Sequence, residues 1–270
     1  MKKIISYSLW GDKPMYNVGA IHNAHLANEI YPGWISRFYL GRSVPNETIK
    51  EIKAIDNTQI VIVESADDWT GMFWRFFAID DSDVTIFRDT DSRLSNRERI
   101  AVNEWLESYQ PLHIMRDHPL HSERIMGGMW GVKSKAFMQT LKKDQNIVKT
   151  KISSFFELTT KWLEFNSRKG NVNRKGIDQE FLRTIYKLMS KYAWIQDQFP
   201  NWNGHSNRHP SVCVEGSLAE FSTGMPVPYQ NKHDFIGQVY DENNVPVEEY
   251  ANILQDALFK IVPDHPWNEK

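Results

Sequence analysis

Short apolar runs alternate with helix-like segments through the first third of the chain, and this alternation constrains the fold more than any other feature. The apolar runs span Lys3–Leu9, Trp34–Leu40, Gln59–Glu64 and Val84–Phe87. They are rich in Ile, Val, Phe and Tyr, the residue types that favour buried strands. Strands that alternate with helices in this way are typical of a parallel sheet covered on both faces. The sequence therefore predicts an α/β fold with a mostly parallel central sheet flanked by helices.

Helices are expected between these strands and again further along the chain. The expected helices span Val18–Ile30, a segment opened by Pro45, Gly71–Ile79, Asn96–Ser108, Ser153–Asn166, Gly176–Tyr192 and Val247–Ile261. A further strand is expected at Leu112–Met115, and the last third, rich in Pro, Gly, Asn and His, predicts a loop-rich C-terminal portion with short strands. Ser95 and Glu98 fit a capping box at a helix start. That structural explanation leaves both residues outside the candidate site.

Two aspartates separated by one residue follow the fourth strand and form the candidate site. Asp89 and Asp91 come directly after Val84–Phe87, in the position where open α/β sheets bind their ligands. In an extended chain, residues i and i+2 point to the same side, so the two carboxylates can face one site. Two like charges at close range need a cation between them, or one of them takes up a proton. The pair therefore predicts a divalent-metal site beside a phosphate-bearing substrate.

The composition excludes several classes of partner. The 32 Lys and Arg residues nearly balance the 34 Asp and Glu residues, so the net charge of -2 gives no argument for nucleic acid or an anionic membrane as partner. The single cysteine, Cys213, excludes a disulfide within the chain and a cysteine-based zinc cluster. We find no apolar stretch long enough for a secretory signal or a membrane span. We therefore expect a cytoplasmic protein.

With its strand context, the segment Arg88–Arg93 (RDTDSR) resembles the DxD motif of glycosyltransferases with the GT-A fold. The resemblance continues downstream in Met115–Pro119 (MRDHP), in Gly127–Trp130 (GGMW) and in Gly176–Gln179 (GIDQ). Together these segments look like those of a little-characterised group of GT-A-like proteins. Clustered glycines such as Gly127 and Gly128 also indicate close approach of a ligand or of another backbone segment, with a bulge or tight bend as the alternative.

The resemblance implies a metal-dependent glycosyltransferase that moves a sugar from a nucleoside-diphosphate sugar, a UDP- or GDP-sugar, to a glycan or other acceptor. It implies Mn²⁺ or Mg²⁺ as cofactor, because a divalent cation stabilises the charge that develops on the departing diphosphate. It also implies one GT-A-like domain over residues 1–270. Residues 1–93 would form the nucleotide-binding half and residues 94–270 the acceptor-side half.

The resemblance also assigns metal ligands. Asp91 matches the direct ligand, and Asp89 would contact the metal through water or contact the ribose. His233 resembles a late histidine that completes the metal shell in some families of this fold, while His205 and His209 compete for that role. A lone histidine in a loop is more often a surface or core residue than a ligand, and that alternative stays open for all three.

Two aspartates are candidates for the reacting groups. Asp178 matches the acidic position that lies near the acceptor or the anomeric carbon, with a helix N-cap as its structural alternative. Asp117 and His118 follow the strand at Leu112–Met115 and are expected at the same edge of the sheet as the acid pair. We read them as acceptor-side candidates, with a general base among them. A turn stabilised by Asp117 before Pro119 would explain the same residues.

A further set of residues is expected to bind the donor. Arg75 is the one charge on an apolar predicted helix, so it should pair with Asp89 or contact the nucleotide, unless its side chain extends to solvent at the helix rim. Arg88 and Arg93 flank the acid pair and could offset phosphate charge. The expected donor-binding residues are Tyr7, Trp10, Arg75, Arg88, Asp89, Gly127 and Gly128.

Two other functions fit parts of the pattern. A metal-dependent phosphohydrolase of the haloacid-dehalogenase type also places Asp-x-Asp after an apolar strand. That pattern requires Thr or Val where this chain has Arg93, and it places the first aspartate near the start of the domain, whereas three strands precede Asp89. A binding protein for nucleotide-sugars or glycans that kept the fold without turnover remains open.

Overall fold

One mixed sheet carries the whole arrangement of the chain. The computed structural model describes residues 1–65, 67–143, 152–199 and 221–261. Within these ranges the strands are β1 (Lys3–Leu9), β2 (Ile35–Leu40), β3 (Thr58–Ile62), β4 (Val84–Phe87), β5 (Leu112–Arg116), β6 (Trp130–Lys133), β7 (Ala193–Asp197) and β8 (Phe221–Thr223). They lie in the order β3-β2-β1-β4-β6-β5-β7-β8. Only β6 is antiparallel to its neighbours β4 and β5, so the mostly parallel sheet predicted from the sequence is confirmed.

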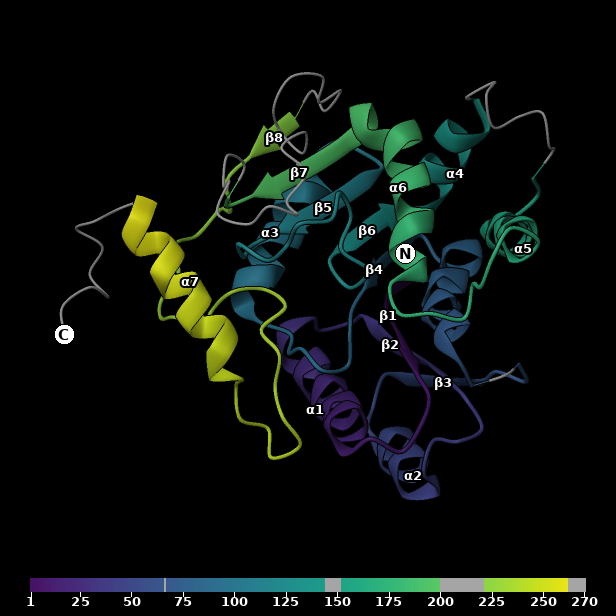
Figure 1. Ribbon diagram of the computed structural model, residues 1–270, viewed down its shortest axis with the longest axis horizontal. Helices are drawn as coiled ribbons and strands as arrows, with labels where there is room; N and C mark the ends of the chain where they lie inside the picture. The colour runs from purple at the N-terminus through teal and green to yellow at the C-terminus, as the bar shows by residue number, and fades with distance from the viewer. Residues whose placement is uncertain (66, 144–151, 200–220, 262–270) are drawn as a thin grey trace.

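Helices cover both faces of this sheet (Figure 1). The helical elements are α1 (Pro14–Ile30), α2 (Asn46–Ala54), η1 (Trp69–Asp81), α3 (Asn96–Glu107), α4 (Ser134–Lys143), α5 (Phe155–Ser167), α6 (Ile177–Met189), η2 (Ser190–Tyr192) and α7 (Glu248–Ile261). One core cluster joins α1, α2 and α3 to β1, β2 and β4. A second cluster joins η1, α4, α5 and α6 to β4, β5, β6 and β7. The predicted α/β fold with flanking helices is therefore present.

Strand β4 shows how side-chain alternation positions the acid pair. Val84 and Ile86 belong to the core under α1 and α3, while Phe87 packs on the opposite face, its ring stacked 4.1 Å from that of Trp130. Both faces of β4 are covered, so all four of its residues are buried, and three of them are apolar. The charged residues that follow can only lie beyond the strand end. The carboxyl end of β4 therefore delivers Asp89 and Asp91 to the edge of the sheet.

Several elements differ from the sequence prediction. The segment expected as an α-helix at Gly71–Ile79 is a run of 3₁₀ turns, η1. Helix α1 begins at Pro14 rather than Val18, because proline is well suited to the first turn of a helix. Strand β6 was not expected, since its Gly131 weakens a strand signal. A Cβ at Gly131 would lie 2.9 Å from Ile86 Cγ2, so close packing against β4 explains the glycine.

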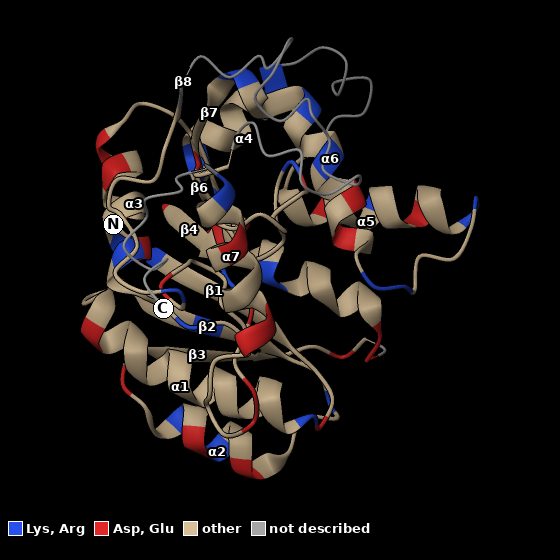
Figure 2. Cartoon of the chain, turned by 60° about the vertical axis from the view of Figure 1, so that its left-hand side comes forward, with Lys and Arg blue, Asp and Glu red and all other residues tan. Residues whose placement is uncertain are grey.

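Acidic and basic residues are mixed over the surface. Figure 2 shows both kinds of charge on α2, which carries Glu47, Lys50, Glu51 and Lys53. This mixture agrees with the small net charge of the sequence. Across the part of the chain that the structure describes, every helix is too short or too polar to cross a lipid bilayer.

Candidate functional site

Asp89 and Asp91 line the same cavity at the carboxyl end of β4. The cavity has a volume of about 210 Å³. Its wall is formed by Arg88, Asp89, Asp91, Ser92, Glu98, His118, Leu120, His121, Met126, Gly128, Met129, Phe235, Ile236, Gly237, Val239 and Tyr250. Burial, and then the negative charge of Asp89, raise the pKa of Asp91 to about 6. Burial and the neighbouring carboxylate thus disfavour the charged form of Asp91, which a bound cation would favour.

Arg75 joins the acid pair to a third carboxylate. Its buried guanidinium forms an ion pair with Asp89 through Nη1 and with Asp178 Oδ2 through Nη2 at 3.0 Å. The backbone of Arg75 is held by β1, since its N–H donates to Ser8 Oγ at 2.9 Å and its carbonyl accepts from Ser6 Oγ at 2.7 Å. The ion pair with Asp89 that the sequence suggested is present. The alternative, a side chain extended to solvent at the helix rim, is wrong.

Asp178 lies in the first turn of α6 and is completely buried. Its Oδ2 bonds to Arg75, while its Oδ1 has no hydrogen-bond partner among the described residues. Burial raises the pKa of Asp178, and the charge of Arg75 works in the opposite direction. The N-cap of α6 is Gly176, at a φ of 79°, so the alternative reading of Asp178 as the N-cap is wrong. Asp178 is positioned by Arg75 instead.

The two glycines of the GGMW segment leave room for the side chains of Arg75, Asp89 and Asp178. A Cβ at Gly127 would lie 2.6 Å from Asp178 Oδ2 and 2.7 Å from Arg75 Nη2. A Cβ at Gly128 would lie 2.6 Å from Asp89 Cγ. Such distances are far shorter than an ordinary contact, so any side chain would displace the carboxylates. The sequence indicated close approach of a ligand or of another backbone segment, or a bend, whereas the groups that approach these glycines are mainly charged side chains.

Glu98 lines the cavity, although the sequence placed it outside the site. One half of the expected capping box is present, because Ser95 Oγ accepts from the N–H of Glu98 at 3.2 Å. The Glu98 carboxylate does not complete the box: its Oε1 accepts from Arg88 Nε and from Tyr31 Oη, both at 2.8 Å. Arg88 thus has its charge offset by Glu98 within the protein. Both residues of this buried pair line the cavity.

Asp117 and His118 lie at the same edge of the sheet as the acid pair. Because β6 is antiparallel to both β4 and β5, those two strands run in the same direction and end together. His118 lines the cavity. Asp117 is fully buried, is absent from the lining residues given above, and holds Arg97 through two bonds of 2.8 Å. The expectation that Asp117 and His118 share the edge of the acid pair is confirmed.

Three other predicted site residues lie away from the cavity lining. Tyr7 is fully buried and stacks on Phe38 with ring centroids 4.7 Å apart. Trp10 is partly exposed and packs edge-on against two other tryptophans of η1. His233 Nε2 lies 3.2 Å from Glu248 Oε1. Across the described residues there is no group of three His, Cys, Asp or Glu side chains arranged to hold a metal. His205 and His209 lie outside the described residues.

The structure brings residues to the site that sequence reasoning did not select. His121 and Tyr250 line the cavity from a turn after β5 and from α7. Tyr16 lies in the first turn of α1, where burial and then the charges of Asp91 and Asp89 raise its pKa. Their distances from the acid pair along the sequence are large. No local pattern in the sequence could have revealed them.

Comparison with known proteins gives matches in structure only. No protein-family model matches the chain, and no curated protein is similar to it in sequence. The galactosyltransferase LgtC, in complex with donor and acceptor sugar analogs, is 11% identical over 94% of this chain and 95% of that chain, with a TM-score of 0.49. A mannosyltransferase from Pyrobaculum calidifontis, in complex with GDP-Man and Mn²⁺, is 8% identical over 51% of this chain and 46% of that chain, with a TM-score of 0.40.

A third match is mannosyl-3-phosphoglycerate synthase from Rubrobacter xylanophilus, which is 11% identical over 67% of this chain and 80% of that chain, with a TM-score of 0.39. By their names two of the three are a galactosyltransferase and a mannosyltransferase, and the third is a synthase of mannosyl-3-phosphoglycerate. Identities and TM-scores as low as these assign no role to any residue. The roles proposed below therefore rest on the geometry of the site in this chain.

Proposed function

We propose that this protein is a metal-dependent glycosyltransferase that moves a sugar from a nucleoside-diphosphate sugar to a hydroxyl-bearing acceptor. One observation carries the proposal. Arg75 bridges Asp89, at the cavity edge, to the buried Asp178, so two carboxylates and one guanidinium are linked beside the cavity that Asp89 and Asp91 line. A UDP- or GDP-sugar is the expected donor, and residues 1–93 supply the donor side of the site.

Asp89 and Asp91 fit a divalent cation. Carboxylate oxygens are the ligands that Mn²⁺ and Mg²⁺ prefer, and both carboxylate-bearing residues line one cavity. When bound, the metal would neutralise charge on the departing diphosphate. Arg75 limits the rotation of the Asp89 side chain and so prepares one ligand of the pair. A third protein ligand, with His233 as the sequence candidate, belongs to the same proposal.

Asp178 remains our candidate for the sugar side of the site, where its negative charge would stabilise the positive charge that develops at the anomeric carbon. In this structure its carboxylate is completely buried, lies outside the cavity lining and is held by Arg75. The bond to Arg75 fixes the carboxylate in place before the donor arrives. Asp117 is kept out of the reacting set, because both of its oxygens accept bonds within the protein.

The test is a screen of UDP- and GDP-sugars by calorimetry and by donor hydrolysis, with and without Mn²⁺. We expect Mn²⁺-dependent donor binding that is lost in Asp91→Asn and retained in Glu107→Gln, a change of an exposed carboxylate on α3. Metal-dependent binding that survives the joint replacement of Asp89 and Asp91 by alanine would show that the site lies elsewhere. Binding without turnover of any donor would favour a non-catalytic binding protein. Release of phosphate from simple monoesters would favour a phosphohydrolase.

A further inference from the structure

One wall of the cavity is formed by a segment from the end of the chain, residues 225–240, called here the C-terminal wall. This segment contributes Phe235, Ile236, Gly237 and Val239 to the cavity lining. It contains no helix, and its isolated bridges join Val239 to Ser92 and Tyr240 to Pro246. Because the segment has no regular secondary structure of its own, contacts with other elements must determine its position.

A buried ion pair lies behind the C-terminal wall. Arg97, on α3, donates from Nε to Asp117 Oδ2 and from Nη2 to Asp117 Oδ1, both at 2.8 Å. The side chains are 2% and 0% exposed. Removing two charges from water is unfavourable unless their remaining hydrogen-bonding groups are also satisfied. The remaining hydrogen bonds of Arg97 and Asp117 therefore indicate which part of the structure this ion pair stabilises.

Most of those remaining bonds go to the C-terminal wall. The N–H of Ile236 donates to Asp117 Oδ2 at 2.9 Å, and Tyr229 Oη donates to the Asp117 carbonyl at 2.9 Å. Arg97 Nη1 donates to the carbonyl of Val227, and the guanidinium lies 4.1 Å from the centroid of the Tyr229 ring. Charge-assisted bonds of this kind are stronger and more directional than neutral ones. The ion pair thus clasps the C-terminal wall at three residues.

The other end of the C-terminal wall is bonded to the acid pair. The N–H of Tyr240 donates to the carbonyl of Asp91 at 2.8 Å, next to the bridge between Val239 and Ser92. The backbone that carries one carboxylate of the site is therefore hydrogen-bonded to the segment that Asp117 holds. Asp117 also fixes a second lining residue, because its N–H donates to His121 Nδ1 at 3.0 Å.

We propose that Arg97 and Asp117 are positioning residues of the transferase site, an inference that rests on the proposed function. They act through the C-terminal wall: the clasp at Ile236 sets the distance between the wall and the acid pair, and the bond at Tyr240 restrains the loop of Asp91. Asp117 thus contributes to the site without touching substrate.

The test compares hydrogen exchange and Mn²⁺ affinity in Asp117→Asn and Arg97→Lys with those of the unchanged protein. Arg97→Lys keeps the charge but loses the two-pronged bond to the carboxylate. We expect amides of the C-terminal wall to exchange about 10-fold faster. In Asp117→Asn the N–H of Ile236 loses a charged acceptor, and in Arg97→Lys the Asp117 carboxylate that accepts this bond is no longer held by two bonds. We expect Mn²⁺ affinity to fall about 10-fold, as for other residues that orient metal ligands.

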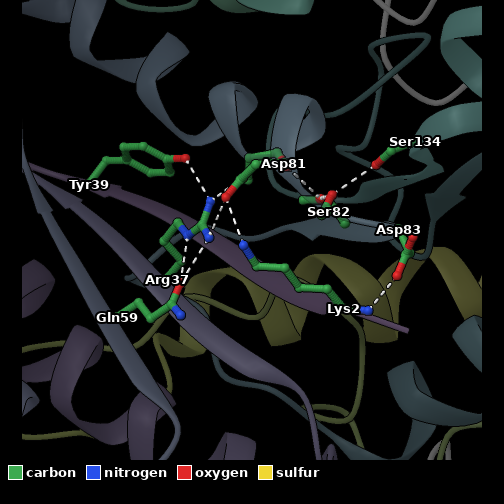
Figure 3. Close-up of polar contacts among 10 residues, drawn as sticks. Lys2, Arg37, Tyr39, Gln59, Asp81, Ser82, Asp83 and Ser134 are labelled. Carbon is green, nitrogen blue, oxygen red and sulfur yellow. Dashed lines mark hydrogen bonds and ion pairs between the residues drawn. The ribbon is translucent and has the colours of Figure 1, made fainter.

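A matched control is available at the opposite end of the sheet strands. Figure 3 shows Arg37 of β2 bonded to Asp81 and Gln59, with the Arg37–Asp81 pair at 2.5 Å. Arg37→Lys likewise loses a two-pronged bond to a carboxylate, here the half-exposed Asp81, and should lower the melting temperature. It should leave wall exchange and Mn²⁺ affinity unchanged. If the clasp variants do not fold, Tyr229→Phe removes the hydroxyl that donates to the Asp117 carbonyl and is expected to speed exchange in the same segment.

The outcomes separate this inference from the proposed function. Wall exchange that is unchanged in Arg97→Lys, Asp117→Asn and Tyr229→Phe would overturn the clasp. Faster exchange with unaltered Mn²⁺ affinity would overturn the link to the acid pair. If the unchanged protein bound no Mn²⁺, the proposed function would fail, while the exchange comparison would still decide whether the clasp holds the wall.

Discussion

Replacement of Gly128 by alanine should damage the site more than the fold. The new Cβ would lie 2.6 Å from Asp89 Cγ and 2.9 Å from the Asp89 backbone nitrogen. Carbon atoms in ordinary contact are separated by about 3.5–4.0 Å, so the Asp89 carboxylate must move by about 1 Å. That movement also weakens its ion pair with Arg75.

The two consequences differ in size. Overpacking a dense interior costs about 1–3 kcal/mol, and for a chain of this length each kcal/mol lowers the melting temperature by about 2–4 °C. A displacement of about 1 Å at a reacting geometry can lower the rate about 100-fold. We therefore expect a folded variant with a modest loss of stability and a loss of donor turnover of that order.

The assay pairs thermal unfolding with Mn²⁺-dependent donor binding and turnover in three variants. Gly170→Ala is the neutral control, because a Cβ there would meet nothing within 4 Å. Gly131→Ala is the packing control, because its Cβ would press on Ile86 at 2.9 Å, outside the cavity lining. If Gly128→Ala bound and turned over donor as well as Gly170→Ala does, the position of the Asp89 carboxylate would not matter for the reaction, and the proposed site would be wrong.

Three further predictions concern buried groups. Arg75→Met leaves the Asp178 carboxylate buried without its cation and should lower the free energy of unfolding by about 3–5 kcal/mol in urea titrations, with partial recovery on adding Asp178→Asn; no recovery would argue against the pair. Burial lowers the pKa of His113 to about 3. Only the unfolded state then binds a proton as pH falls below about 6.5, so about 2 kcal/mol of stability is lost by pH 5, and His113→Gln should flatten that part of the profile. Gly19→Ala should be destabilising, because its Cβ would meet the Thr90 backbone carbonyl, and an unaltered melting temperature would contradict that contact.

The difference between the sequence prediction of Glu98 and its observed role shows where local reasoning ends. The bond from the N–H of Glu98 to Ser95 connects residues three positions apart, so the sequence predicts it. The carboxylate has a choice of partners, and burial next to Arg88 and Tyr31 decides it. An unpaired buried cation would be far more costly than an incomplete capping box. The tertiary contact therefore overrides the local motif.

Asp117 makes the same point for the candidate site. Its place at the end of β5 followed from strand order along the chain, and the structure confirms the shared edge with the acid pair. Whether its carboxylate faces a substrate or an arginine depends on Arg97 and on a segment more than a hundred residues further along. Side-chain partners at that separation leave no periodic signal in the sequence.

The sequence by itself determined the alternation of strands and helices, the end of β4 at Phe87 and the acid pair that follows it, and it singled out Gly127 and Gly128 as a place of close approach or of a bend. These features depend on local backbone preference and on side-chain alternation, which neighbouring residues encode. Only the tertiary structure decided that Arg75 joins Asp89 to Asp178 and that the C-terminal wall closes the cavity. Burial determines which charges must find partners, and burial is a property of the folded chain as a whole.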